Sequence, residues 1–170
     1  MALEIERRFL IDSLKLPVLP SKRILSIKQG YLSKGVRVRR TNVVYSTGGN
    51  VPEACITIKK TVAHGTNKEF EYEIPVEDGD ELMEMCEFTL TKNRYHYPVG
   101  SHVFEIDVFS DDLYGLIIAE IELSSINEAV DIPSWFGPEI TGNRDYSNNT
   151  LASMPDKNEI LEMSRAKLKE

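Results

Sequence analysis

Charged side chains recur at two-residue spacing along this chain, in segments whose remaining positions are apolar. Glu4 and Glu6 open the pattern, and the VRVRR segment at 36–40 repeats it with arginines. Successive side chains of a β-strand point to opposite faces, so residues two apart share a face. Each of these segments therefore predicts a strand with one apolar face and one face that carries several charges.

Faces of this kind can bind a polyanion and a metal ion together. Guanidinium groups bind phosphate through paired hydrogen bonds and lysine ammonium groups bind it as point charges, so a row of bases can hold a polyanion. Carboxylates in the same cavity would repel that anion unless a hard cation lay between them. Mg²⁺ and Mn²⁺ are suitable cations, because they take oxygen ligands from carboxylates, phosphate and water.

The ordinary alternative is a half-exposed sheet whose charged face lies in water. Two features of the charges favour an enclosed site instead. They are rich in Arg and Glu, with few of the Ser and Thr residues that fill solvated strand faces, and their signs are sorted, whereas a surface selected for solubility mixes the signs. The mainly acidic segments are 2–11, 68–76, 102–109 and 116–123, and the basic ones are 36–41, 54–61 and 89–97.

These segments belong to a succession of about eight predicted strands, separated by turn residues. The predicted strands are 2–11, 24–32, 36–41, 54–61, 68–76, 89–97, 102–109 and 116–123. Short connections make neighbouring strands antiparallel. A sheet of about eight strands can close into a barrel with room for a small ligand. An open sheet and a sandwich are the competing arrangements.

Helices are expected between and after the strands. Apolar residues at helical spacing predict a helix over 78–87, with Asp78 as its N-cap. The other predicted helical segments are 125–130, 146–152 and the charged tail 156–169, and a Pro/Trp/Gly segment lies at 133–142.

Length and composition limit the class of protein. A chain of 170 residues suffices for one sizeable domain. The net charge of −7 argues against nucleic acid as a partner, because phosphate-backbone binding requires a basic surface. The longest apolar run, at 116–119, is far too short for a membrane span, and the first residues lack a secretory signal pattern, so the expected compartment is the cytoplasm.

Cysteine and histidine give no sign of a zinc site. Cys55 and Cys86 are too few for a cysteine-based site or a disulfide scaffold and are interpreted as packing residues. The three histidines lack the spacing of a zinc-binding motif.

The segment EIERR at 4–8 resembles the E-x-E-x-K signature of the CYTH superfamily, the triphosphate tunnel metalloenzymes. The resemblance extends in order over about residues 2–152. The segments that carry it are QGYL at 29–32, VRVRR at 36–40, ITIKK at 56–60, EYEIP at 71–75, KNRY at 92–95, FEIDVF at 104–109, AEIEL at 119–123, WFGPEIT at 135–141 and the turn at 146–149. Two positions depart from the pattern: Arg8 stands where Lys is usual, and Asp145 stands where relatives often carry a base.

The resemblance implies a mainly β (α+β) fold, an eight-stranded antiparallel closed barrel that is open at both ends and flanked by a few helices. It places the tunnel domain at 1–154 and a C-terminal helical tail at 155–170. The implied activity is divalent-metal-dependent hydrolysis of a short triphosphate, with inorganic triphosphate as the best single substrate. Two alternatives remain: adenylyl cyclisation of ATP to cyclic AMP, and non-catalytic binding of polyphosphate.

The same resemblance assigns roles to the charged positions. The expected substrate-binding bases are Arg8, Arg37, Arg39, Lys59, Lys92 and Arg94. The expected ligands of Mg²⁺ or Mn²⁺ are Glu4, Glu6 and Glu122, followed by Glu120 and Asp107. Glu4, Glu6, Lys92 and Tyr31 are expected to act in the reaction itself. Glu71, Glu73 and Glu105 are assigned to a second metal, to the attacking water or to salt bridges with the bases.

Other residues stay open between two interpretations. Tyr31 either orients a phosphate group or packs within its strand, and Arg144 either reaches a tunnel mouth or is exposed, the latter being favoured. Trp135 and Phe136 are core or interface residues. A homodimer through the acidic helical pieces or the Trp135–Phe136 segment is as well supported as a monomer. The expected partner is a small-molecule triphosphate, with neither nucleic acid nor membrane.

Overall fold

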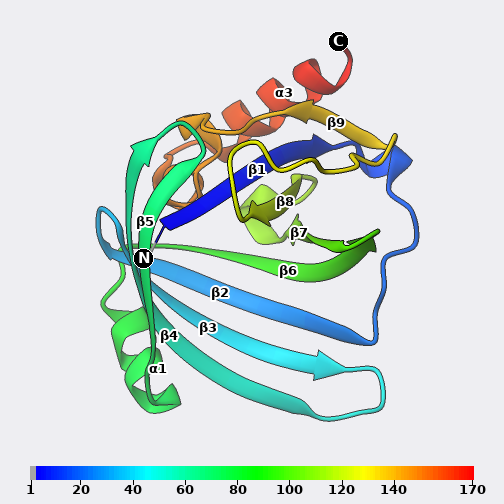
Figure 1. Cartoon of the computed structure of the whole chain (residues 1–170). Helices are drawn as coiled ribbons and strands as arrows, with labels where there is room; N and C mark the ends of the chain where they lie inside the picture. Colours follow the sequence, from blue (N-terminus) through cyan, green and yellow to red (C-terminus); the bar gives the residue numbers. More distant parts are fainter. Residues whose placement is uncertain (1–2) are drawn as a thin grey trace.

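The computed structural model describes residues 3–170 as a closed antiparallel barrel with short helices outside it (Figure 1). The strand order is β5-β4-β3-β2-β6-β7-β8-β1, and β1 also pairs with β5, which closes an eight-stranded barrel and excludes an open sheet or a sandwich. The strands are β1 (Leu3–Ile11), β2 (Arg23–Ser33), β3 (Val36–Tyr45), β4 (Asn50–Ala63), β5 (Thr66–Glu73), β6 (Phe88–Val99), β7 (His102–Phe109), β8 (Ile117–Leu123) and β9 (Phe136–Glu139). The predicted first strand began at residue 2, which lies outside the described residues.

The ninth strand, β9, was not predicted. It pairs with the part of β1 near Phe9 and Ile11. Strand β5 pairs only with the beginning of β1, at Leu3–Ile5, so it leaves this part of the same edge free for β9. A side chain at Gly137 would place its Cβ 2.6 Å from the carbonyl oxygen of Leu10, so glycine permits this close approach. Because the strand is short and contains Gly and Pro, it lacks the alternating pattern that predicts a strand.

Two predictions about helices were wrong in detail. Helix α1 spans Val76–Glu84 and its N-cap is Pro75 in an extended conformation, so Asp78 lies in the first turn and does not cap the helix. No helix forms at 125–130. There the Glu128 carboxylate accepts hydrogen bonds from the backbone and hydroxyl of Ser124, which stabilises a turn instead.

The remaining helical segments are short. The 3₁₀ turns are η1 (Ser13–Lys15), η2 (Asp111–Leu113) and η3 (Arg144–Tyr146), and the later helices are α2 (Asn148–Ser153) and α3 (Lys157–Leu168). Within residues 3–170, no helix combines the length and the apolar character that crossing a membrane requires.

One hydrophobic cluster lies outside the barrel, on the outer faces of β1, β7 and β8. Phe9, Phe104 and Ile121 belong to it. Trp135 and Phe136 pack over these strands, with ring centroids 4.9 Å apart for Phe104–Phe136. The segment that follows β8 therefore covers this side of the sheet.

A second cluster fills one end of the barrel interior and is called the floor here. By strand parity Leu10 and Ile118 follow Arg8 and Glu120 along the inner face. They pack with residues from η3, α2 and α3, which contact β6, β1 and β9. The floor consists of Leu10, Leu90, Phe109, Ile118, Tyr146, Leu151 and Ile160, with other buried neighbours. Whereas the resemblance implied a barrel open at both ends, this end is closed by apolar side chains.

Candidate active site in the barrel interior

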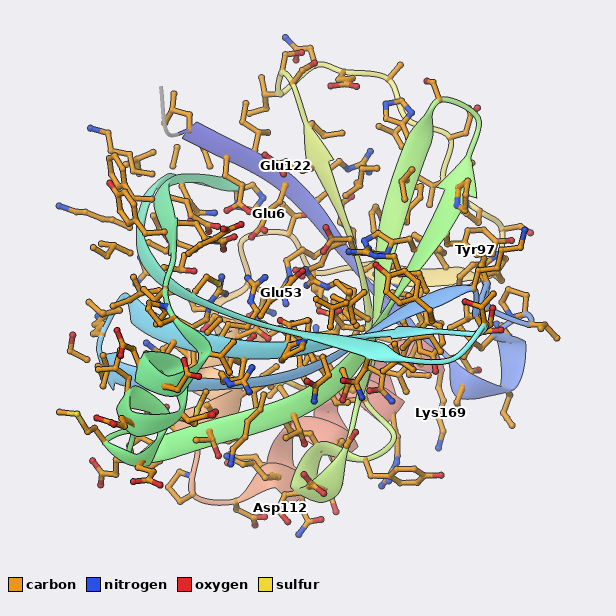
Figure 2. The ribbon with its side chains drawn as sticks, turned by 90° about the horizontal axis from the view of Figure 1, so that it is seen from below. Glu6, Glu53, Tyr97, Asp112, Glu122 and Lys169 are labelled. Atoms are coloured by element: carbon orange, nitrogen blue, oxygen red, sulfur yellow. The ribbon has the colours of Figure 1, made fainter. Side chains whose placement is uncertain are left out.

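The barrel gathers the charges of its inner face into two walls. Strands β7, β8, β1 and β5 are consecutive around the barrel and carry the acidic inner faces, and β6, β2, β3 and β4 are consecutive and carry most of the bases. Glu6 lies directly opposite Glu122 in the ladder between β1 and β8 (Figure 2). We call these four-strand groups the acidic wall and the basic wall. The acidic and basic segments that alternate along the sequence therefore form two separate regions of the barrel interior.

Lys59 of the basic wall lies among three carboxylates of the acidic wall. Its Nζ is 2.7 Å from Glu4 Oε2, 3.4 Å from Glu69 Oε2 and 3.6 Å from Glu6 Oε2. Burial alone would lower the pKa of Lys59, but Glu6 and Glu4 raise it above its usual value. The ammonium group thus stays charged and holds the three acids together.

The acids around Lys59 are incompletely neutralised. Burial, followed by repulsion from Glu120, raises the pKa of Glu6. Burial and the charge of Glu4 raise the pKa of Glu69 in the same way. At the exposed end of β8, burial and then Glu4 raise the pKa of Glu122. Such carboxylates gain from a further cation, because it would offset their mutual repulsion.

Asp107 organises the basic side of the interior. Its carboxylate accepts hydrogen bonds from Lys92 Nζ at 2.6 Å and from Arg94 Nε and Nη2 at 2.7 and 2.8 Å. Against the effect of burial, these two cations hold the pKa of Asp107 well below its usual range. Both carboxylate oxygens are already in use, so the geometry favours a role in positioning bases over the predicted role as a metal ligand.

The other partners of this ion-pair network come from β7 and β8. Arg94 also pairs with Glu105 and lies 3.7 Å from Glu120 Oε2. Burial raises the pKa of Glu105 despite the neighbouring Arg94. Burial lowers the pKa of Lys92 to about 8, so its ammonium group is mostly protonated at neutral pH but can lose its proton a little above it.

Several guanidinium atoms of the interior are buried without an acceptor. Arg8 donates from Nη1 to the carbonyl of Tyr146 at 2.9 Å; its Nε lies 3.7 Å from Glu120 Oε2, but neither Nε nor Nη2 has a hydrogen-bond acceptor. The Nε atoms of Arg37 and Arg39 are likewise buried and unpaired. Burial, and after it the charges of Arg37 and Arg94, lowers the pKa of Arg39. An unsatisfied buried donor is costly, so this arrangement favours an anionic ligand.

Buried acceptor atoms without a donor face these groups. Within residues 3–170 they include Glu4 Oε2 and Glu69 Oε2, which lie 2.7 and 3.4 Å from Lys59 Nζ, and Glu120 Oε2, which lies 3.7 Å from Arg8 Nε and Arg94 Nη2. None of these ion pairs is a hydrogen bond. No group of three Asp, Glu, His or Cys side chains in this part of the chain is arranged to hold a metal ion. The unpaired oxygens nevertheless have the donor chemistry that a hard divalent cation prefers.

The remaining predicted residues lie at the margins of the site. Glu71 accepts a hydrogen bond from Thr57 and pairs with Arg37 and Arg39 at 4.0 and 3.5 Å, whereas Glu73 is exposed near the end of β5. Arg144 is exposed, as the favoured interpretation held.

Tyr31 lies at the boundary between the charged interior and the floor. It faces inward opposite Arg37 in the ladder between β2 and β3, and its ring packs against the floor. Its hydroxyl accepts a hydrogen bond from Gln29 Nε2 at 3.1 Å. Burial raises the pKa of Tyr31, so the hydroxyl remains protonated and can donate a hydrogen bond.

Four polar groups of the interior were missed by the sequence analysis. Gln29 and Thr57 are buried on inner faces; strand parity already places Thr57 on the face of Lys59, but neither residue was assigned a role. Asn148 accepts a hydrogen bond from Lys92 at 3.3 Å, and the Tyr146 carbonyl holds Arg8. The last two come from the turn before α2, so only the tertiary fold brings them to the strands.

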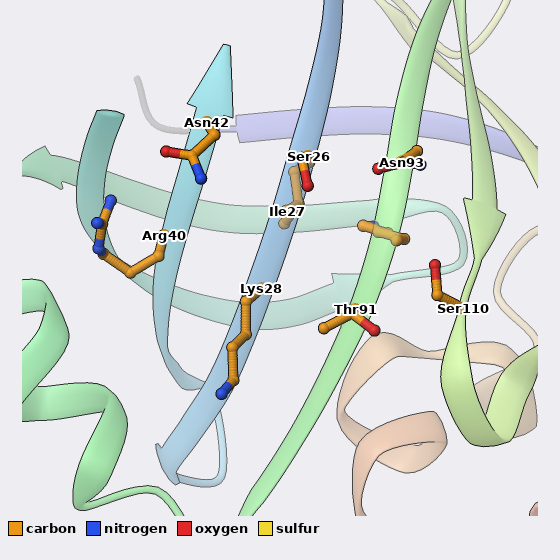
Figure 3. A pocket seen from close by; sticks show the side chains of 9 residues that line it. Ser26, Ile27, Lys28, Arg40, Asn42, Thr91, Asn93 and Ser110 are labelled. Atoms are coloured by element: carbon orange, nitrogen blue, oxygen red, sulfur yellow. The ribbon is translucent and has the colours of Figure 1, made fainter. Parts of the chain in front are cut away.

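A cavity of about 250 Å³ lies elsewhere, on the outer face of β2, β3 and β6 (Figure 3). Polar side chains such as Ser26, Asn42 and Asn93 line it and point away from the barrel interior. Arg40 at its edge is already paired with Asp80 at 2.5 Å. The unpaired buried charges are on the other side of the sheet, so this cavity is not the candidate site.

Comparison with known proteins gives relatives over nearly the full chain. An inorganic triphosphatase of Acetivibrio thermocellus is 35% identical over 164 residues, which cover 93% of this chain and 98% of the relative. An inorganic triphosphatase of Nitrosomonas europaea is 30% identical, with 88% of this chain and 96% of the relative covered.

A solved structure gives the same indication. A crystal structure of an inorganic triphosphatase superposes with a TM-score of 0.61 at 28% identity, covering 92% of this chain and 98% of that one. No family model matches the chain.

Proposed function

Since the chain belongs to the family of the inorganic triphosphatases, we propose that it hydrolyses inorganic triphosphate inside the barrel with the help of a divalent cation. One observation carries the proposal: four buried guanidinium nitrogens, on Arg8, Arg37 and Arg39, have no hydrogen-bond acceptor in the same interior where carboxylate oxygens have no hydrogen-bond donor. A phosphate chain with a bound cation would satisfy both sets. In this proposal the chain is a member of the CYTH superfamily and its interior is the triphosphate tunnel.

The bases of the barrel bind the substrate. Arg37 and Arg39 present unpaired Nε atoms from neighbouring positions on β3, and Arg8 presents Nε and Nη2 from across the barrel. Lys92 and Arg94 are held in place by Asp107 and need no rearrangement to contribute positive charge. Preorganised charge of this kind stabilises the charge that develops on transferring phosphoryl oxygens.

The carboxylates Glu4, Glu6 and Glu122 would hold Mg²⁺ or Mn²⁺, with Glu120 as a further ligand. Their fit to a cation is supported by the raised pKa values of Glu6 and Glu122 and by buried oxygens of Glu4 and Glu120 that accept no hydrogen bond. The bound metal supplies Lewis-acid polarisation of the phosphoryl group and lowers the pKa of a water molecule. Lys92, whose pKa is about 8, donates a hydrogen bond from Nζ to a phosphate oxygen and offsets the charge of the leaving group.

The floor supports a short substrate. A long polyphosphate would have to pass through a barrel that Leu10, Phe109, Ile118 and their neighbours fill at one end. A triphosphate can lie wholly between the mouth and this end.

A phosphate-release panel tests the proposal. Triphosphate, pyrophosphate, ATP, thiamine triphosphate and long polyphosphate are each incubated with Mg²⁺ or Mn²⁺, and both phosphate and cyclic AMP are measured. The proposal expects rapid metal-dependent phosphate release from triphosphate. Cyclic AMP with pyrophosphate from ATP would instead support the cyclase, and tight metal-dependent binding of triphosphate without turnover would support a binding protein.

A further inference from the structure

The outer face of β4 and β5 carries large apolar side chains that nothing in the described chain covers. Ile58, Phe70 and Tyr72 are 47%, 45% and 56% exposed, and Val62 next to them is 47% exposed. Ile58 lies directly opposite Phe70, and Ile56 lies opposite Tyr72, so these side chains form one continuous surface. We call Ile56, Ile58, Val62, Phe70 and Tyr72 the β4–β5 patch. Contiguous apolar patches of this kind usually mark interaction sites.

Parts of the outer face elsewhere on the barrel are covered by other segments of the chain. Trp135 and Phe136 pack over β1, β7 and β8, within 5.4 Å of Phe9 and 4.9 Å of Phe104 between ring centroids. Helix α1 covers β2, β3 and β4 near Gly30, where an added Cβ would meet Cys86 at 2.7 Å. The Trp135–Phe136 segment, one of the interfaces expected from the sequence, is thus used within the chain.

Charges of opposite sign flank the β4–β5 patch, and of these only Asp80 has an ion-pair partner, Arg40, within the described chain. At one end Lys60 and Lys68 are both exposed and lie directly opposite each other in the strand ladder, an arrangement that is destabilising for like charges. At the other end β5 leads through Pro75 into α1, whose sequence VEDGDELME contains five acids and no base. Glu84 in its last turn also opposes the helix dipole.

From these observations we infer that a second copy of this chain docks on the β4–β5 patch about a twofold axis that lies in the plane of the interface and runs across the strands. A twofold interface uses the same surface on both partners. The rotation places the apolar centre of one copy on that of the other. It also places Lys60 and Lys68 of each copy against the acidic α1 of its partner. One operation therefore neutralises both ends and covers the centre, which is why a second copy fits better than an unrelated protein.

This inference is independent of the proposed function. The side chains of the β4–β5 patch point away from the barrel interior, on the face opposite Lys59, Glu69 and Glu71. Loss of the dimer is therefore expected to leave the interior charges in place.

The test is the mass in solution, by sedimentation equilibrium over a wide concentration range. The wild-type chain of 19.3 kDa is expected to have twice that mass. Two variants reverse the flanking charges: Lys60→Glu with Lys68→Glu, and Glu77→Lys with Glu81→Lys, where the helical residues are four apart on one face. Each variant alone is expected to weaken the dimer by about 100-fold, since juxtaposed like charges cost several kcal/mol.

Mixing the two variants makes the test specific. In the mixed dimer the lysine–acid contacts at one end are restored with reversed sign and those at the other end keep their native sign, so a heterodimer with near wild-type affinity is expected. Lys28→Glu, on the exposed outer face of β2, is the matched control and should remain dimeric. A wild-type protein of single-chain mass at all concentrations overturns the inference. So does a mixture that stays monomeric while circular dichroism and metal-dependent activity show both variants to be folded.

Discussion

The acidic and basic walls of the barrel differ in how their charges are held. On the basic wall, Lys92 and Arg94 share one buried carboxylate, that of Asp107, through three hydrogen bonds of 2.6 to 2.8 Å. On the acidic wall, Glu4, Glu6 and Glu69 share the single ammonium of Lys59. The basic wall is therefore positioned by the fold itself, whereas the acidic wall holds more negative charge than its partners neutralise.

This difference indicates which wall contributes stability and which contributes binding of a cation. A buried ion pair adds little net stability because both charges are desolvated, but removing one partner is strongly destabilising because it leaves the other charge buried and unpaired. Crowded carboxylates of raised pKa oppose folding at neutral pH, which a fold tolerates where they serve a ligand. Variants of the two walls should therefore have opposite effects on stability.

Removing the carboxylate that Lys92 and Arg94 of the basic wall share is expected to have the largest effect. Asp107→Asn leaves Lys92 and Arg94 without their buried counter-charge and should lower the free energy of unfolding by about 3–5 kcal/mol. Denaturant unfolding at pH 7 measures this change. Asp112→Asn, on the exposed η2 turn, is the control. A loss below about 1 kcal/mol would contradict the positioning role of Asp107.

On the acidic wall, activity and stability should separate. Glu6→Gln is expected to lower kcat for triphosphate by about 10²–10³-fold, as loss of one group aimed at the transition state does. The metal-free protein should become slightly more stable, because a buried carboxylate of raised pKa has been removed. Steady-state kinetics and thermal unfolding measure the two effects. Glu73→Gln, at an exposed position, should change neither; equal losses of stability and activity in Glu6→Gln would refute the comparison.

The hydrogen bond from Lys92 of the basic wall to Asn148 is expected to contribute about tenfold to kcat/KM for triphosphate. Asn148→Leu removes the acceptor of one Lys92 hydrogen bond, and loss of an outer partner of this kind costs about 10–100-fold at metal sites. We expect KM for triphosphate to rise more than kcat falls, because the ammonium group is displaced but kept. Asn149→Leu is the neighbouring control. Unchanged KM in Asn148→Leu would show that Asp107 alone positions Lys92.

The smallest effect concerns the pH dependence of stability without metal. For Glu6, Glu69 and Glu105 the pKa is raised above the ordinary value of 4.5, so the folded state binds more protons than the unfolded chain. These groups therefore make the free energy of unfolding increase as the pH falls from neutrality through their raised pKa values. Their stabilising contribution is fully present below the unfolded-state pKa of 4.5. Asp107 has the opposite sign but acts only at still lower pH, since its pKa is depressed.

Melting temperatures at pH 5 and pH 7 in EDTA check this expectation, with Glu6→Gln as the comparison. Added Mg²⁺ should flatten the dependence. A wild-type protein that loses stability between pH 7 and pH 5 to the same extent as Glu6→Gln would contradict it.

Much of the barrel and of its charged lining could be predicted from the sequence. Alternation of charged and apolar residues, as in Glu4 to Arg8 and Arg37 to Arg39, depends only on strand geometry, and the fold keeps it. The sorting of signs follows because the acidic strands are neighbours in the barrel. Ladder partners and ion pairs such as Arg94 with Asp107 require the register, which the sequence does not contain.

The rest depends on contacts between distant segments. Strand β9 exists because Gly137 lets its backbone approach Leu10, and no local pattern reports this contact. Leu10 and Ile118 could be assigned to the inner face, but not their burial under Tyr146, Leu151 and Ile160, which come from the far end of the chain. The turn at 125–130 shows helical composition overridden by the carboxylate of Glu128.

The apolar floor also determines the order of events after hydrolysis. With Leu10, Phe109 and Ile118 packed under the C-terminal helices, the two phosphate products share one exit. The product that lies deeper must wait until the one nearer the mouth has departed. Release is therefore sequential, and the outer product, when added in excess, can retain the inner one behind it.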